Sequence, residues 1–174
     1  GIFNYIVRMK YRSLETKGLQ RILPKGGMWG FFGWHTVDPT KHTSIIITEG
    51  EYDCMAVSQV IHDTINPRNL PFREIPVISL PNGCNSLPPE LIQPLESFEK
   101  IYLWLDFDKS GQDAAEKFSK KLGLQRCVIV TPPADLKNPP KDANDALRQD
   151  TNLIIRMLTI AKGVTHKRID DLSK

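Results

Sequence analysis

Cysteine is scarce in this 174-residue chain, and its three cysteines are scattered. Cys54, Cys84 and Cys127 form no Cys-x-x-Cys pair, which argues against a disulfide framework or a zinc site in this stretch and fits a reducing compartment. No apolar run approaches the roughly 20 residues of a membrane-spanning helix, so we expect no membrane span. The Gly-x-x-x-x-Gly-Lys-Ser/Thr motif is also missing, which excludes a P-loop motor from this stretch.

What is present is typical of a globular protein. Hydrophobic residues make up 40% and charged residues 25% of the chain, which is ordinary for a soluble domain that buries a core. The length fits one domain, or one domain with an appendage. The chain starts at Gly1 and carries no visible targeting segment, so we expect it to be a fragment excised from a longer protein.

Positive charge is concentrated near the amino terminus, although the net charge is only +3. Residues 1–26 contain a single acid, Glu15, and six basic residues: Arg8, Lys10, Arg12, Lys17, Arg21 and Lys25. Cations in such a segment can bind the phosphate backbone of single-stranded DNA, with Arg8, Lys10, Arg12 and Arg21 as the predicted contacts. A solvated basic face is the alternative, because most runs of charge serve no partner.

Apolar segments alternate with helical patterns along most of the chain. We predict strands at 45–47, 77–80, 101–105 and 127–130, each apolar throughout, and helices at 51–61, 88–98, 112–122, 142–149 and 152–161. Uninterrupted apolar strands between helices predict an α/β fold with a mostly parallel four-stranded sheet that is covered on both faces. Before it, residues 1–25 predict a hairpin or short meander, and residues 26–42 predict a loop rich in glycine and aromatic residues.

Three segments follow from these patterns. We expect a small, basic and aromatic β-rich subdomain at 1–43, the α/β domain at 44–150, and a final helix with the start of a linker at 151–174. The aromatic residues of the first segment could stack on bases, but a packed loop is the favoured interpretation of Trp29, Phe31, Phe32 and Trp34.

Carboxylates follow two of the predicted strands directly. Glu49 ends the first strand, whereas Asp106 and Asp108 end the third, and Asp53 lies one helical turn after Glu49. Ligands of parallel sheets bind at the carboxyl ends of strands, and clustered carboxylate oxygens suit Mg²⁺. Residues two apart in an extended segment point to the same side, so Asp106 and Asp108 could share an ion. The alternative is that these acids only cap the turns before helices.

The two acidic strand ends resemble the TOPRIM domain of topoisomerases and of bacterial- and phage-type primases. The resemblance lies in the Glu-Gly of Thr48–Asp53, the Asp-x-Asp of Asp106–Gly111 and the Lys-Asp-Ala-Asn of 141–144, and it covers about residues 44–150. It implies a TOPRIM fold that binds Mg²⁺ or Mn²⁺ through Glu49, Asp53, Asp106, Asp108, Asp142 and Asn144. Glu49, Asp106 and Asp108 would be the catalytic residues, and Gly83, Lys109 and Gly111 would lie against phosphate.

Several further stretches resemble the Twinkle family of mitochondrial replicative helicases, which are built like phage primase-helicases. These stretches are Phe31–His35, Leu80–Gly83, Leu87–Leu91, 114–118, 121–122 and 126–127. The resemblance implies the primase-like part of such a helicase, in the mitochondrial matrix and its nucleoids, linked to a helicase domain that is absent here. Vertebrate members have lost most TOPRIM acids, whereas this sequence keeps Glu49, Asp106, Asp108 and Asp142.

Two functions remain open at this point. The favoured one is a module that binds single-stranded DNA and divalent metal and supports a helicase without synthesising primers. The alternative is an active primase, in which the metal held by Asp106 and Asp108 neutralises the phosphates of a nucleoside triphosphate and Glu49 is a ligand or base. A TOPRIM nuclease is a more distant possibility.

Overall fold

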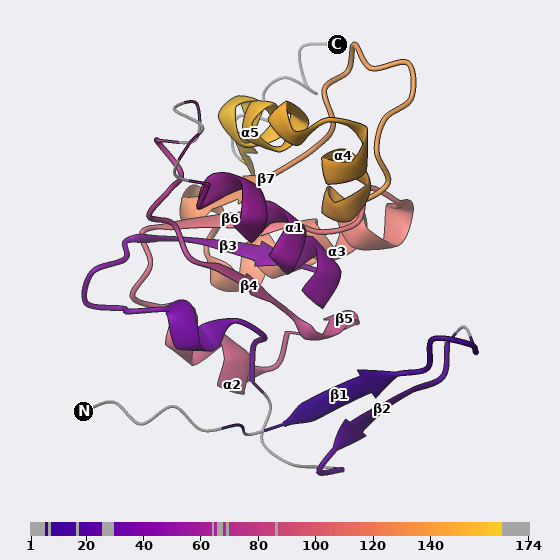
Figure 1. The fold of residues 1–174 in the computed structure, drawn as a ribbon. Helices are drawn as coiled ribbons and strands as arrows, with labels where there is room; N and C mark the ends of the chain where they lie inside the picture. Colours follow the sequence, from indigo (N-terminus) through magenta and orange to yellow (C-terminus); the bar gives the residue numbers. More distant parts are fainter. Residues whose placement is uncertain are drawn as a thin grey trace.

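The computed structural model describes residues 6, 8–16, 18–25, 30–63, 65, 68, 70–85 and 87–164. Its centre is a five-stranded sheet in the order β4-β3-β6-β7-β8 (Figure 1). The strands are β3 (Ser44–Thr48), β4 (Val77–Ser79), β6 (Lys100–Trp104), β7 (Cys127–Ile129) and β8 (Lys162–Gly163). The first four are parallel and β8 is antiparallel at the edge, so the predicted α/β fold with a mostly parallel sheet is confirmed.

Helices cover both faces of this sheet. One hydrophobic cluster joins the sheet to α1 (Glu51–Ile61), α4 (Ala143–Gln149) and α5 (Thr151–Ile160). A second cluster joins the opposite face to α2 (Pro89–Ile92), the 3-10 turn η3 (Gln93–Leu95) and α3 (Lys109–Leu122). The short elements η1 (Trp34–Thr36), β5 (Pro81–Cys84) and η4 (Leu124–Arg126) complete the described part of the body. Within that part, no helix is long and apolar enough to cross a bilayer.

Burial on both faces explains why the strands are apolar throughout. In β6, Ile101 and Leu103 pack in the cluster with α3, whereas Tyr102 and Trp104 pack in the cluster with α1. Successive side chains of a strand point to opposite faces, so a strand covered on both sides needs apolar residues at every position. The same reasoning applies to β3 and β7, whose residues divide between the two clusters in the same way.

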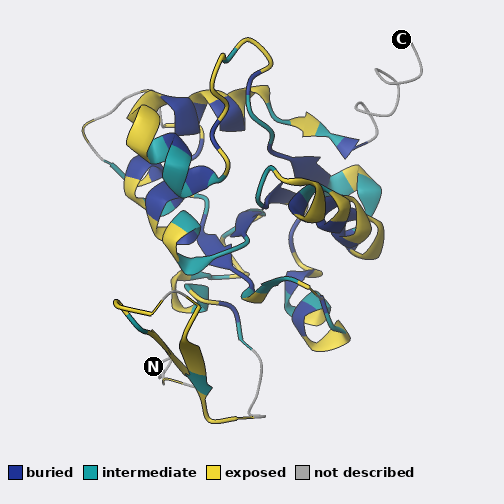
Figure 2. Ribbon diagram, turned by 90° about the vertical axis from the view of Figure 1, so that its right-hand side faces the viewer, coloured by how far each residue is buried: buried dark blue, intermediate teal, exposed yellow. Residues whose placement is uncertain are grey.

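A β-hairpin precedes this body. β1 (Met9–Arg12) pairs antiparallel with β2 (Gln20–Leu23), with Met9 opposite Leu23 and Arg12 opposite Gln20. Figure 2 shows the hairpin almost wholly exposed, in contrast to the dark core strands. The predicted amino-terminal hairpin is therefore confirmed within the described residues, whereas the expected alternation at Phe3, Tyr5 and Val7, like Trp29, lies outside them.

Three elements differ from the sequence prediction. The helix expected over 88–98 ends as α2 at Ile92 and continues as η3, because Pro94 cannot donate an amide hydrogen bond and its ring crowds the preceding turn. Pro81-Asn82-Gly83 is a turn sequence, but Pro81–Cys84 is extended as β5. The edge strand β8 was not predicted, because two residues carry no detectable periodicity.

Arg126 joins the ends of two elements on the α3 side of the sheet. Its Nε donates to the carbonyl of Leu122 at the end of α3, and its Nη1 donates to the carbonyls of Leu95 and Phe98 at 2.8 Å each. These carbonyls lie at or beyond the ends of α3 and η3, where no partner within the helix is available. Arg126 therefore fastens the α3 layer to the connection that leads into β6.

We expect Arg126→Ala to lower the free energy of unfolding by about 3 kcal/mol, because the hydrogen bonds from one charged donor to several backbone carbonyls are lost. Urea denaturation measures this change. Arg156→Ala is the matched control: its ion pair with Asp135 lies at the surface, with the side chains 47% and 65% exposed, so the expected loss is about 0.5 kcal/mol. Equal losses in the two variants would contradict the fastening role.

Candidate metal centre and nucleic-acid cleft

The candidate metal centre lies where the direction of the chain connections reverses. Strands β3 and β6 are neighbours, but α1 leaves β3 toward one face and α3 leaves β6 toward the other. Such a reversal opens a crevice at the carboxyl ends of the two strands. Glu49 and Asp106 follow those strands, and Glu49 Oε2 accepts a hydrogen bond from the Asp106 amide at 3.2 Å. The structure therefore brings these two strand ends together, as the sequence predicts.

The start of α4 is brought to the same crevice. The Phe107 amide donates to the carbonyl of Lys141 at 2.9 Å, which ties the loop after β6 to the segment before α4. From α1, Asp53 Oδ1 accepts a hydrogen bond from the Asn144 amide at 3.0 Å. Asp53 and Asn144, 91 residues apart in sequence, are thus joined beside the crevice, and the charge of Asp142 acts on both Asp53 and Asp106.

Burial and repulsion raise the pKa of two carboxyl groups in this crevice. The pKa of Asp106 rises from 3.8 to about 7, first because burial disfavours the charged form and then because of the charges of Glu49, Asp53, Asp142 and Asp108. Burial is also the main cause of the raised pKa of Asp53, and the Asn144 amide partly offsets it. Five carboxylates therefore share one electrostatic environment that a bound cation would relieve.

The ligand set is not assembled, however. Among the described residues, no three Asp, Glu, His or Cys side chains lie close enough together to hold one ion. Asp108 instead caps α3 by accepting from the Gly111 amide at 2.8 Å, and Asp142 caps α4 by accepting from the Asp145 amide at 2.6 Å. Helix capping thus directs Asp108 to a backbone donor in this arrangement, and the roles of Glu49, Asp106 and Asp108 as metal ligands stay predictions.

The chemistry of the donors nevertheless fits a hard divalent cation. Carboxylates at the crevice and the amide oxygen of Asn144 are oxygen ligands, which Mg²⁺ and Mn²⁺ prefer. Glu49, Asp53, Asp106 and Asp142 are all partly buried and face charges of their own sign.

The residues predicted to lie against phosphate occupy different positions around the crevice. Gly111, in the first turn of α3, is buried, and a Cβ there would lie 2.2 Å from the carbonyl oxygen of Asp106. Gly83 has φ +62°, and a Cβ there would lie 3.4 Å from Glu49 Oε1. Lys109 is exposed at the start of α3. Close packing explains Gly111, whereas the phosphate-binding roles of all three stay predictions.

The basic hairpin forms a cleft of about 610 Å³ with the body. Arg8, Lys10 and Arg12 are among the residues that line this cleft. Arg21 is exposed and lies opposite Tyr11 in the register of the hairpin. It is not among the residues that line the cleft, so the structure separates it from Arg8, Lys10 and Arg12.

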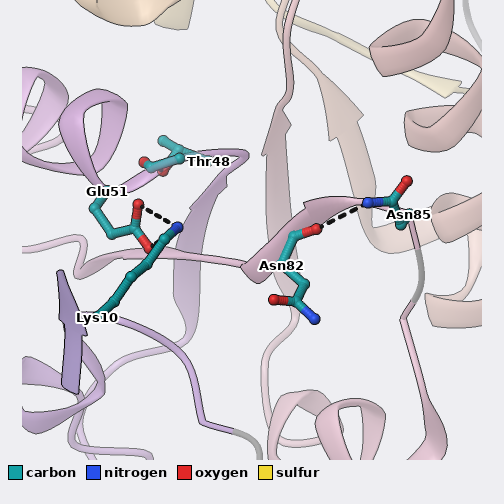
Figure 3. A network of polar contacts seen from close by, with 6 residues as sticks. Lys10, Thr48, Glu51, Asn82 and Asn85 are labelled. Carbon is teal, nitrogen blue, oxygen red and sulfur yellow. Dashed lines mark hydrogen bonds and ion pairs between the residues drawn. The ribbon is translucent and has the colours of Figure 1, made fainter. Parts of the chain in front are cut away.

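Lys10 already has a partner across this cleft. Its Nζ lies 2.8 and 3.0 Å from the two carboxylate oxygens of Glu51, in the first turn of α1 (Figure 3). Sequence reasoning missed this partner, along with Tyr52 and Met55 of α1, which also line the cleft. The signal in the sequence was the i, i+3 spacing of Tyr52 and Met55 within the predicted helix at 51–61.

The raised pKa of Asp106 makes stability depend on pH. Its carboxyl group has a pKa near 3.8 when unfolded and about 7 when folded, so the folded state binds more protons between these values. Stability therefore falls as pH rises from about 4 to 7, and the cost is fully present above pH 7. We expect Asp106→Asn to raise the melting temperature more at pH 8 than at pH 5, measured in EDTA. Asp113→Asn, an exposed carboxylate on α3, is the control, and an equal response of both variants would contradict the assignment.

Comparison with known proteins places this fold and site in a class. A Toprim-like family profile matches residues 46–147, more than half of the chain, and the chain belongs to that family. The matched range begins within β3 and ends within α4, so it spans Glu49, Asp106, Asp108 and Asp142 together.

Individual relatives are similar over most of the chain. A primase homolog protein of Arabidopsis thaliana is 30% identical over 156 residues, which are 82% of this chain and 42% of that protein. The primase fragment of the bacteriophage T7 primase-helicase aligns with a TM-score of 0.65 at 23% identity, over 88% of this chain and 57% of the fragment.

A second T7 structure is similar as well. It contains the lagging-strand DNA polymerase with the primase domains of two gp4 subunits bound to an RNA/DNA hybrid and dTTP. The match has a TM-score of 0.59 and 23% identity over 83% of this chain and 71% of the matched chain. At this identity the T7 structures show a shared fold, and the chain spans less than half of its plant relative.

Proposed function

We propose that this chain is a primase-like Toprim module that binds single-stranded DNA in its hairpin cleft and a divalent metal at the β3–β6 crevice. The observation that carries the proposal is the meeting of Glu49 and Asp106 at the reversal point of the sheet, where the pKa of Asp106 rises to about 7. The T7 primase domains bound to an RNA/DNA hybrid and dTTP support nucleic acid and nucleoside triphosphates as partners.

The predicted site residues lie on two surfaces, one for the metal and one for the phosphates of the DNA strand. Glu49, Asp53, Asp106, Asp108, Asp142 and Asn144 would hold the metal, which supplies charge neutralisation for phosphate groups when bound. Arg8 and Arg12 would bind strand phosphates through long-range attraction and direct contact. Lys10 would join them once a phosphate competes with Glu51, because both groups offer anionic oxygens to the same ammonium.

We further propose that this module is part of a Twinkle-type replicative helicase that acts in mitochondrial DNA replication. It is supported by the sequence stretches that resemble that family, and it includes the mitochondrial location and the covalently linked helicase domain. An active primase is the second candidate, and it is favoured by the complete set of strand-end acids that this chain retains.

Thermal unfolding with metal tests the proposed crevice. Clustered carboxylates repel one another, so millimolar Mg²⁺ or Mn²⁺ should raise the melting temperature by several degrees. The double substitution Asp106→Asn with Asp108→Asn should abolish this rise. Asp113→Asn, on the same helix but exposed, should preserve it. A metal response that survives in the double variant would place the ion elsewhere and remove the basis of the proposal.

A further inference from the structure

Two cavities adjoin along α1. The hairpin cleft, of about 610 Å³, and a second cavity, of about 620 Å³, have two lining residues in common, Phe32 and Met55. Both volumes lie in the range of small-molecule and nucleotide sites. The two cavities therefore adjoin at Phe32 and Met55, with the hairpin lining one and the carboxyl half of α1 lining the other.

Large apolar side chains remain exposed at the junction. Phe32 is 43%, Tyr52 55% and Met55 47% exposed, although each is large enough to be a core residue. The preceding Phe31 is buried and stacks on Trp34 with ring centroids 5.6 Å apart. The loop therefore buries one phenylalanine ring and leaves the next exposed where the two cavities adjoin.

The backbone at Phe32 is fixed to the sheet. The Phe32 amide donates to the Ser79 carbonyl at 3.1 Å, and the Ser79 amide donates back at 3.0 Å, so the loop is fixed to β4. Gly33 follows with φ +84°, and a Cβ there would lie 2.8 Å from the carbonyl oxygen of Val77. The backbone at Phe32 is thus ordered before a partner binds, which lowers the entropic cost of binding.

The two cavities differ in charge and chemistry. The hairpin cleft contains Arg8, Lys10 and Arg12, whereas the residues that line the second cavity include Asp63 and neither lysine nor arginine. The second cavity instead offers the Gln59 amide and the His35 imidazole, and neither side chain bonds to another described residue. Such a cavity disfavours a phosphate and suits an uncharged ring with donors and acceptors at its edge.

We propose that the second cavity is a nucleobase subsite for the same single strand whose phosphates bind in the hairpin cleft. The strand passes over Phe32 and Met55, where a base stacks on the Phe32 ring, and the next base enters the cavity toward Gln59. This inference rests on the proposed DNA-binding function and adds the path of the bound strand, from the hairpin cleft to the second cavity. Stacking on an aromatic face accepts any base, so affinity should depend on the presence of bases rather than on their sequence.

Fluorescence anisotropy with labelled oligothymidylates tests the subsite in the 174-residue chain. Loss of one stacking platform should weaken binding by roughly 5- to 150-fold in Phe32→Ala, with the salt dependence unchanged. Phe32→Tyr keeps the aromatic face and should bind like the parent chain. Ile160→Ala is the matched control, because Ile160 has the same 43% exposure but lies on α5 and outside both cavities. An abasic strand of equal length should bind the parent and Phe32→Ala chains equally.

Substitutions in the hairpin distinguish failure of the base subsite from failure of DNA binding as a whole. Arg8, Lys10 and Arg12 changed together to Ala should weaken every strand, abasic ones included, and should flatten the salt dependence. If this triple variant weakens binding while Phe32→Ala matches the parent on oligothymidylate, the subsite is disproved and the DNA-binding function stands. If neither change alters affinity, both are disproved. Circular dichroism checks folding, and Phe32→Leu, which keeps apolar volume without an aromatic face, replaces Phe32→Ala if that variant unfolds.

Discussion

Asp106→Ala should eliminate template-dependent incorporation of labelled ribonucleotides in the full-length protein, if that protein is a primase. Asp106 is partly buried and is surrounded by the charges of four other carboxylates. Its loss should therefore lower the affinity of the crevice for a cation more than the loss of any other residue there. Without the ion, the phosphates of a bound nucleotide are neither neutralised nor aligned. The expected result is loss of detectable product rather than a partial decrease.

The same change should leave single-stranded DNA binding intact or slightly tighter. Asp106 lies at the strand ends, whereas Arg8 and Arg12 bind from the hairpin, and the removal of one negative charge reduces repulsion of the phosphates. Anisotropy on the same templates measures this. Parallel loss of binding and synthesis would show that Asp106 supports the fold rather than the chemistry, and Asp113→Ala serves as the control.

A wild-type protein that incorporates no ribonucleotide with Mg²⁺ or Mn²⁺ on varied templates would decide between the two candidate functions. The primase function would then be excluded, and the DNA-binding module would stand on its binding data alone. Our proposal favours the module, so this outcome is the expected one under physiological conditions. The metal-dependent rise in melting temperature should be present in either case, because it depends only on the crevice.

Gly111→Ala should be among the most destabilising single substitutions in this chain. A Cβ at Gly111 would lie 2.2 Å from the Asp106 carbonyl oxygen and 2.9 Å from the Asp106 amide nitrogen and carbonyl carbon. All three are backbone atoms, so no side-chain rotation can relieve the overlap, and α3 must move away from β6. We expect a loss of about 3 kcal/mol or more in the free energy of unfolding.

This shift should also damage the metal centre. Movement of α3 displaces Asp108, which caps the helix, and disturbs the backbone of Asp106, so the metal-dependent rise in melting temperature should shrink. Ser110→Ala is the control: Ser110 is the preceding residue, is exposed, and should change stability by less than about 0.5 kcal/mol. A Gly111→Ala chain as stable as Ser110→Ala would contradict the close packing of α3 on the strand end.

Much of the fold was predictable because its signals are local. The apolar runs at 45–47, 77–80, 101–105 and 127–130 each require burial on both faces, and the helices between them then require a parallel sheet. Acids placed directly after two of these runs must lie at one edge of that sheet. Glu49 and Asp106 could therefore be assigned to one site from the sequence, and the structure places them in contact.

The tertiary structure alone decided how the polar groups are paired. Asp108 binds the Gly111 amide as a helix cap, Lys10 pairs with Glu51, and Arg126 donates to carbonyls some 30 residues away, none of which local spacing can specify. The sequence also could not separate Phe31, which is buried, from Phe32, which is exposed at a groove. Periodicity reports which residues share a face, but the partner of that face depends on crossovers and register that only the folded chain fixes.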